Sequence, residues 1–150
     1  MEKNGAKPIP TDGEVQQLLY RSRAVADKRA AAATTLILSR RFSTPRLLCL
    51  RGCDLDPAGQ TVMLCLPRRS PEKIPITTLT IIQLFAIRIR NDETKIFTKR
   101  SPQSLPLHLL LRGLLQDAGL GRYVVSDFTR WSQRQAPTTL DMVATIATRW

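Results

Sequence analysis

Residues 47–56 read Leu-Leu-Cys-Leu-Arg-Gly-Cys-Asp-Leu-Asp, and this stretch decides the architecture of the chain. The Ser-Thr-Pro of residues 43–45 before it is typical of a helix start, with Ser or Thr as N-cap and Pro in the first helical turn. We therefore expect a short helix over residues 46–51 that ends at Gly52, because glycine favours helix C-caps. The Asp-Pro-Ala-Gly of residues 56–59 has turn chemistry, so strands should follow.

A β-hairpin is expected directly after this turn. Residues 61–66 and residues 73–76 are rich in strand-forming side chains. The segment between them, residues 67–72, is basic and contains two prolines, which suits a loop. The two runs are therefore predicted to pair antiparallel.

The chain before residue 47 is predicted to be helical after a flexible tail over residues 1–10. Thr11 and Glu14 form the Thr-x-x-Glu pattern of a capping box, which indicates a helix over residues 11–23. The Ala-rich stretch over residues 27–38 favours a second helix, because Ala has the highest helix propensity.

The chain after the hairpin is also predicted to be mainly helical. First we expect a helix from the cap Thr77 or Thr78 to about residue 90, a loop over residues 91–94 and an extended Ile96-Phe97. A helix over residues 105–118, ended by Gly119, should follow. The last two expected elements are a helix from the cap Ser126 to about residue 135, where Pro137 breaks it, and a helix from Thr139. The sequence thus predicts one α+β domain over residues 11–150, mostly helical with a small antiparallel β-hairpin.

Composition narrows the possible classes of protein. With 150 residues and 43% hydrophobic residues, the chain is long and apolar enough for one folded core. No apolar run approaches the roughly 18 residues of a membrane span, and residues 1–10 lack the apolar core of a signal peptide. The three cysteines, Cys49, Cys53 and Cys65, have no paired spacing, so a reduced, cytoplasmic protein is expected, associated with the nucleoid if the protein is bacterial.

No cofactor or metal site is predicted. Cys49 and Cys53 lack a second pair of zinc ligands, and Asp54 and Asp56 lack a third carboxylate. The single histidine, His108, lies among leucines and is interpreted as a packed or edge residue. There is no glycine-rich nucleotide motif.

The charge indicates an acidic partner. The formal net charge is +11, with 17 Arg against 6 Lys, and residues 21–51 alone carry +7. Arg forms planar, bidentate contacts with phosphate, and a basic surface gains affinity for nucleic acid by releasing counterions. No helix pairs a Lys-rich face with a Trp/Phe face, so a membrane surface is not expected. A merely solvated, charged surface is the alternative.

The quoted stretch, together with the order of the elements, resembles the catalytic domain of tyrosine recombinases, the phage integrases. That family has a helix reading Leu-Leu-x-Leu-Arg-x-x-Asp-Ile-Asp, matched here by residues 47–56, and then a β-hairpin. The hairpin leads through a Val-Pro-Leu-like segment, here residues 74–77, into a helix. A Leu-Phe segment and an Ala-Gly after a later helix correspond to residues 96–97 and 118–119. The resemblance covers about residues 11–150.

The first catalytic positions of the family are altered in this sequence. Its first catalytic Arg corresponds to Ser43, and the Glu that follows it corresponds to Arg46. The hairpin Lys falls at Arg68 or Arg69, which keeps a cation but changes the proton donor. Without the first Arg, the resemblance implies that a bidentate clamp on the scissile phosphate is missing.

The later catalytic positions are altered as well. The His-x-x-Arg motif falls on residues 126–129, which retain neither residue, with Arg130 one position further on. Trp150 corresponds to the later His or Trp, and the nucleophilic Tyr would come after it, so no nucleophile is expected. Tyr20 and Tyr123 do not occupy the nucleophile position.

The sequence therefore predicts a non-catalytic protein that binds double-stranded DNA, as a regulator or accessory factor of a mobile element or plasmid. Two alternatives remain: an interaction module that docks onto an active recombinase or onto itself, and a truncated recombinase fragment. In the family, the start of the third helix, the hairpin and the later helix converge on the DNA backbone. The resemblance implies the same for the DNA-binding candidates Arg40, Arg41, Arg46, Arg68, Arg69, Lys73, Arg130 and Arg134.

Overall fold

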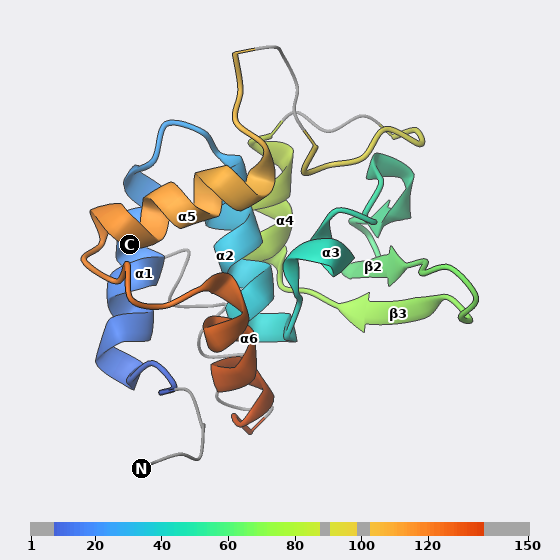
Figure 1. The fold of residues 1–150 in the computed structure, drawn as a ribbon. Helices are drawn as coiled ribbons and strands as arrows, with labels where there is room; N and C mark the ends of the chain where they lie inside the picture. The colour runs from blue at the N-terminus through green and yellow to red at the C-terminus, as the bar shows by residue number, and fades with distance from the viewer. Residues whose placement is uncertain (1–7, 88–90, 99–102, 137–150) are drawn as a thin grey trace.

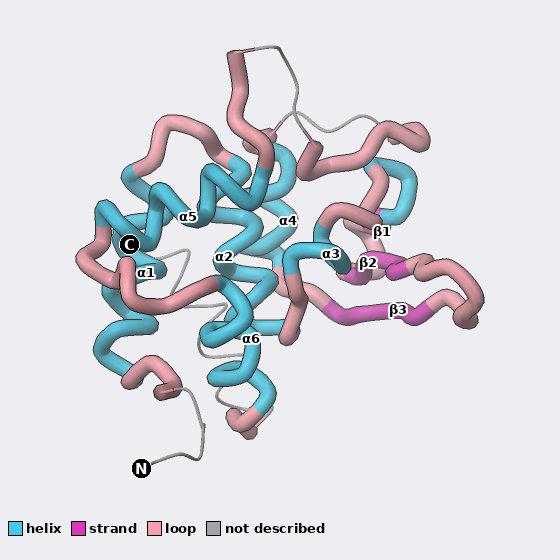
Figure 2. Tube along the Cα trace, viewed as in Figure 1, coloured by secondary structure: helices cyan, strands magenta, loops and turns pink. Residues whose placement is uncertain are grey.

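The computed structural model describes residues 8–87, 91–98 and 103–136. Its helices pack around a central one, and a small sheet extends from one side (Figure 1; Figure 2). The architecture is α+β and mostly helical, as predicted. The elements in chain order are α1 (Asp12–Ala24), α2 (Arg29–Arg40), α3 (Thr44–Leu47), the 3-10 helix η2 (Gly52–Asp54), β1 (Leu55–Asp56), β2 (Thr61–Leu64), β3 (Glu72–Pro75), α4 (Thr78–Phe85), α5 (Leu107–Asp117) and α6 (Val125–Gln133).

Helix α2 is the centre of the core. It packs against α1, α4, α5 and α6, which surround it (Figure 1). Its Ala30, Ala32 and Ala33 are completely buried, and so are Leu36 and Leu38. Small side chains let the neighbouring helices approach closely, so the Ala-rich sequence both favours the helix and makes room for its neighbours.

The sheet has three antiparallel strands in the order β1-β2-β3. Val62 of β2 pairs with Leu55 of β1 on one side and with Ile74 of β3 on the other. Val62 and Leu64 are buried and their neighbours in β2 are half-buried, which is the alternation of a sheet with one face on the core. The predicted hairpin is confirmed, and β1 is a strand that the sequence reasoning missed.

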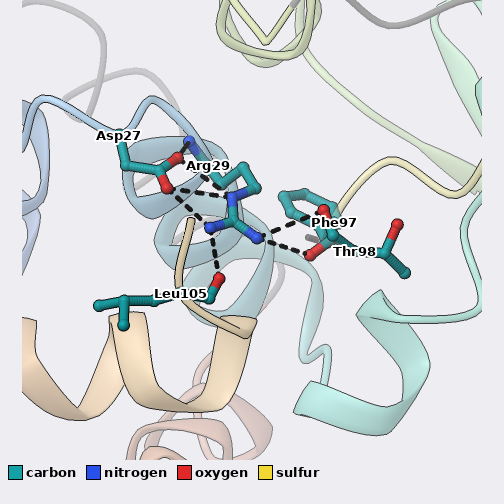
Figure 3. Close-up of polar contacts among 5 residues, drawn as sticks. All are labelled: Asp27, Arg29, Phe97, Thr98 and Leu105. Atoms are coloured by element: carbon teal, nitrogen blue, oxygen red, sulfur yellow. Dashed lines mark hydrogen bonds and ion pairs between the residues drawn. The ribbon is translucent and has the colours of Figure 1, made fainter. Parts of the chain in front are cut away.

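A buried arginine links α2 to two distant segments (Figure 3). Arg29 is only 2% exposed and forms an ion pair with Asp27, with 2.7 Å between Nη2 and Oδ2. Its Nη1 donates to the carbonyls of Phe97 (3.1 Å) and Thr98 (3.4 Å), and its Nη2 donates to the carbonyl of Leu105 (2.6 Å). A guanidinium offers five donors in a fixed plane, so one side chain satisfies three carbonyls and a carboxylate.

Two predicted helix ends are confirmed in detail. The Thr11 side chain accepts from the Glu14 N–H while the Glu14 carboxylate accepts from the Thr11 N–H, which is the predicted capping box. Gly119 has a φ of +74°, and the Leu120 N–H donates to the Leu115 carbonyl at 2.8 Å. Helix α5 therefore ends at a left-handed glycine, as expected.

The helix predicted over residues 46–51 is wrong in its bounds, because α3 already ends at Leu47. Gly52 does not cap it but begins η2. The Asp54 carboxylate accepts from the Arg51 N–H at 2.9 Å, and the Gly52 N–H donates to the carbonyl of Thr94. These bonds turn the backbone away from α3, and sequence periodicity carries no sign of them.

The cap at Ser126 is also wrong. Helix α6 begins at Val125, and its N-cap is Val124, whose N–H donates to the Asp127 carboxylate at 2.8 Å. The Asp127 carboxylate in the first turn thus accepts from the N-cap N–H, while the Val124 side chain itself offers no cap.

The remaining predicted bounds differ in smaller ways. Helix α4 begins after the cap Thr77, as expected, but ends at Phe85 rather than near residue 90. Residues 96–97 are bends, and the neighbouring Lys95 forms an isolated bridge with Arg51. Most of the tail over residues 1–10, the break at Pro137 and the helix from Thr139 lie outside the described residues.

Candidate nucleic-acid interface

The junction between α2 and α3 lies against the end of α6 through Arg41. Arg41 has a left-handed backbone with φ of 63°, so the chain turns sharply there. Its Nε donates to the carbonyl of Ser132 at 3.3 Å and its Nη2 to that of Gln135 at 2.9 Å. The last carbonyls of a helix lack partners within the helix. Arg41 therefore caps the carboxyl end of α6 with part of its guanidinium.

The same junction is tied to the sheet by two further arginines. The Nε of Arg40 donates to the carbonyl of Pro75, at the end of β3, at 2.6 Å. Arg46 on α3 forms a long ion pair of 3.5 Å with Glu72 at the start of β3. Since both partners of the Arg46 pair are partly exposed, this pair contributes little stability. Arg40, Arg41 and Arg46 thus lie where α2, α3, β3 and the end of α6 meet.

A hydrogen bond places α6 beside Ser43. The Thr129 hydroxyl donates to the carbonyl of Phe42 at 2.9 Å, and both residues are buried. Ser43, the next residue, is the half-buried N-cap of α3, and its hydroxyl makes no capping bond. Ser43, which the sequence resemblance matched to the family's first catalytic Arg, therefore lies next to α6, on which the expected His-x-x-Arg position falls.

Exposed cations lie on the hairpin loop, on the adjoining strand β3, which contains Lys73, and at the end of α6. Arg68, Arg69 and Lys73 are exposed, and the loop projects away from the helices (Figure 1). Arg134, the C-cap of α6, is exposed too. Within the described residues none of these four cations forms an ion pair. Their charges are therefore available to an anion without first breaking an internal contact.

Arg130 is already paired inside the protein. Its guanidinium contacts the carboxylate of Asp127 one turn earlier on α6. Asp127 is 3% exposed and also accepts from the Val124 N–H. Arg130 lies in α6 whereas Arg134 is its C-cap, and a buried carboxylate offsets the charge of Arg130.

The other residues singled out from the sequence have structural roles. Cys49 is half-buried and packs against the core, whereas Cys53 is exposed. Asp56 accepts from the Gly59 N–H at 3.0 Å and closes the predicted turn. His108 is exposed at the rim of a hollow of about 350 Å³ that also involves Arg112 and Tyr123.

The described part of the chain lacks both a cluster of metal-binding side chains and a helix suited to a membrane. It contains no group of three or more His, Cys, Asp or Glu side chains that could bind a metal ion. It also contains no helix with the length and apolar character required to cross a bilayer.

Comparison with known proteins adds one result. No protein-family model and no curated protein matches the sequence. The crystal structure of XerA recombinase is similar in three dimensions, with a TM-score of 0.70 at 10% sequence identity over 99% of this chain. The chain has a tyrosine-recombinase-like fold. It spans 62% of the XerA chain, so the match concerns the fold and only part of that protein's length.

Sequence reasoning missed two features of this recombinase-like domain. One is the use of Arg41 as the cap of α6, which joins residues 91 and 94 positions apart and leaves no local signal. The other is the Asp127–Arg130 pair. Unlike the Arg41 contacts, this pair has a local signal, the i, i+3 spacing of opposite charges on a helix.

Proposed function

We propose that this chain binds double-stranded DNA through the phosphate backbone and does not cleave it. The observation that carries the proposal is a set of exposed cations on the hairpin loop, on β3 and at the end of α6 that have no acidic partner among the described residues, namely Arg68, Arg69, Lys73 and Arg134. They belong to a chain of net charge +11 with a recombinase-like fold. Phosphate contacts of this kind supply most non-specific affinity for DNA.

The arginines at the junction form a second group in this proposal. Arg40, Arg41 and Arg46 each donate hydrogen bonds within the protein and remain partly exposed. Their guanidinium groups are therefore held in place by protein acceptors. A held guanidinium loses little conformational entropy when a phosphate binds. We assign the three junction arginines to orienting the DNA backbone, and the exposed cations to attracting it.

The absence of cleavage follows from the residues beside Ser43. A serine there cannot provide the charge that stabilises a scissile phosphate. Asp127 and Arg130 have the spacing of the family's His-x-x-Arg, one residue later than the register expected from the sequence. If the motif is placed on these two residues, Asp127 neutralises the charge of Arg130, and its buried carboxylate repels a phosphate. A regulator or accessory factor of a mobile element or plasmid is a biological role compatible with binding alone.

Two measurements test this proposal with the full chain. Fluorescence anisotropy of a labelled duplex at low salt should show saturable binding, and no change in anisotropy would refute DNA binding. Prolonged incubation with the duplex followed by denaturing electrophoresis should give no covalent protein–DNA species. A covalent species would refute the non-catalytic part and favour a recombinase fragment.

A matched pair of variants locates the surface. Replacing Arg68 and Arg69 by Ala should weaken binding on all sequences alike. Replacing Arg21 and Arg112, which lie on the α1 and α5 side of the molecule, removes the same charge elsewhere (Figure 1). Equal weakening by both pairs would assign the affinity to net charge alone and refute the proposed surface.

A docking function has its own supporting observation. Ile82 and Phe85 on α4 are 56% and 52% exposed, which is unusual for large apolar side chains. They provide a surface that suits self-association or a partner recombinase. Light scattering of the chain alone and mixed with an active recombinase distinguishes these cases, and monomers in both samples would refute docking.

A further inference from the structure

An open hollow of about 420 Å³ lies between the segment after α3 and the end of β2. Its walls carry two thiols, Cys49 and Cys65, and two cations, Arg51 and Lys95. Pro67, at the start of the hairpin loop, forms part of the wall. None of these residues has a role in the DNA-binding proposal, so the hollow is a separate chemical site.

Cys65 is the thiol on the polar side of the hollow. Cys65 directly follows β2 and lines the hollow together with Arg51. Cys65 is half-buried, and its Sγ lies 3.8 Å from Nη2 of Arg51. Cys49, by contrast, packs against the hydrophobic core.

The two cations are held next to each other by the backbone. Arg51 and Lys95 form an antiparallel bridge, which the bond from the Ile96 N–H to the Leu50 carbonyl (2.9 Å) continues. Arg51 is oriented by Asp54, with 2.9 Å between Nη2 and Oδ1, and this carboxylate raises the pKa of Arg51. Within the described residues Lys95 forms no ion pair. The hollow therefore has an excess of positive charge beside a reachable thiol.

We propose that Cys65 is a site of reversible S-thiolation by disulfides of anionic thiols, with glutathione disulfide as the representative reagent. The Cys65 thiolate attacks one sulfur of the disulfide, a new S–S bond forms and the original one breaks. The second half leaves as a thiolate and takes up the proton that Cys65 released. Arg51 and Lys95 attract the carboxylates of the reagent and so raise its local concentration at Cys65. This chemistry is independent of DNA binding.

Mass spectrometry of the reduced full chain with glutathione disulfide tests the site. One glutathionyl group should appear first on Cys65, several times faster than on Cys53, which is exposed but outside the hollow. Cys65→Ser should abolish the fast addition, and the matched Cys53→Ser should leave it unchanged. Addition to Cys49 or Cys53 at an equal or greater rate, or an internal disulfide without glutathione, would overturn the proposal.

The charge of the reagent tests the role of the cations. Lys95→Gln should slow glutathionylation of Cys65 roughly threefold at low ionic strength, because one unit charge is removed beside the entering anion. Its bridge to Arg51 uses only backbone atoms, so the fold is retained. Reaction with cystamine, a cationic disulfide, should not slow. Equal slowing with both reagents, or with neither, would refute an anion-selective hollow.

Discussion

Truncation of Arg29 should be among the most destabilising single changes in this domain. In Arg29→Met the methylene packing is largely kept, but the carbonyls of Phe97, Thr98 and Leu105 lose their guanidinium donor. Breaking a buried ion pair by removing one partner costs about 3–5 kcal/mol. Because Asp27 is 31% exposed, its carboxylate remains partly hydrated, so the expected loss of unfolding free energy lies at the lower end of this range, about 3 kcal/mol. That is a large part of the roughly 5–15 kcal/mol available to a domain.

Urea denaturation followed by circular dichroism measures this loss. Arg112→Met, an exposed Arg on α5, is the matched control and should change the unfolding free energy by less than about 0.5 kcal/mol. If Arg29→Met does not fold at all, the milder Asp27→Asn should still fold and lose about 1 kcal/mol, because a charge-assisted bond becomes a neutral one. A loss below about 1 kcal/mol for Arg29→Met would refute the role given to this guanidinium.

Three further predictions concern single residues. Hydrogen bonds from Arg29 lower the pKa of Asp27 from the ordinary 3.8. The carboxylate's contribution to stability is therefore complete above pH 3.8 and is lost as the pH falls through the lower folded-state pKa. The unfolding free energy measured against pH should show this loss in the wild type and not in Asp27→Asn. Thr11→Ala should cost about 1 kcal/mol in urea denaturation by removing the capping box, and no change would contradict that cap. Gly119→Ala should cost about 1 kcal/mol because its φ is +74°, and thermal unfolding at an unchanged temperature would contradict the left-handed C-cap.

The sequence predicts those elements whose signals are local. The capping box at Thr11, the Ala-rich α2, the turn over residues 56–59, the hairpin and the end of α5 at Gly119 each depend on residues within one or two turns of each other. For these features side-chain chemistry and backbone geometry are linked directly. These local signals are sufficient to predict the α+β class and the recombinase-like order of elements.

The features that the sequence misses depend on residues far apart in the chain. Gly52 begins η2 because its N–H reaches Thr94, and Arg41 turns to the end of α6 about 90 positions away. Periodicity cannot reveal such contacts. The sequence predicts the candidate interface as a set of basic residues. It does not show which of them donate hydrogen bonds inside the protein, as Arg41 and Arg130 do, because those bonds depend on how the helices pack.

The salt dependence of DNA binding tests the central claim most directly. Each phosphate contact contributes about −0.9 to the slope of log K against log salt concentration for duplex DNA. Anisotropy titrations of the wild type, Arg68→Ala/Arg69→Ala and Arg21→Ala/Arg112→Ala should therefore give a slope shallower by about 2 for the hairpin pair and nearly unchanged for the control pair. No binding by the wild type at low salt, or equal slopes for all three proteins, would contradict backbone binding through the hairpin.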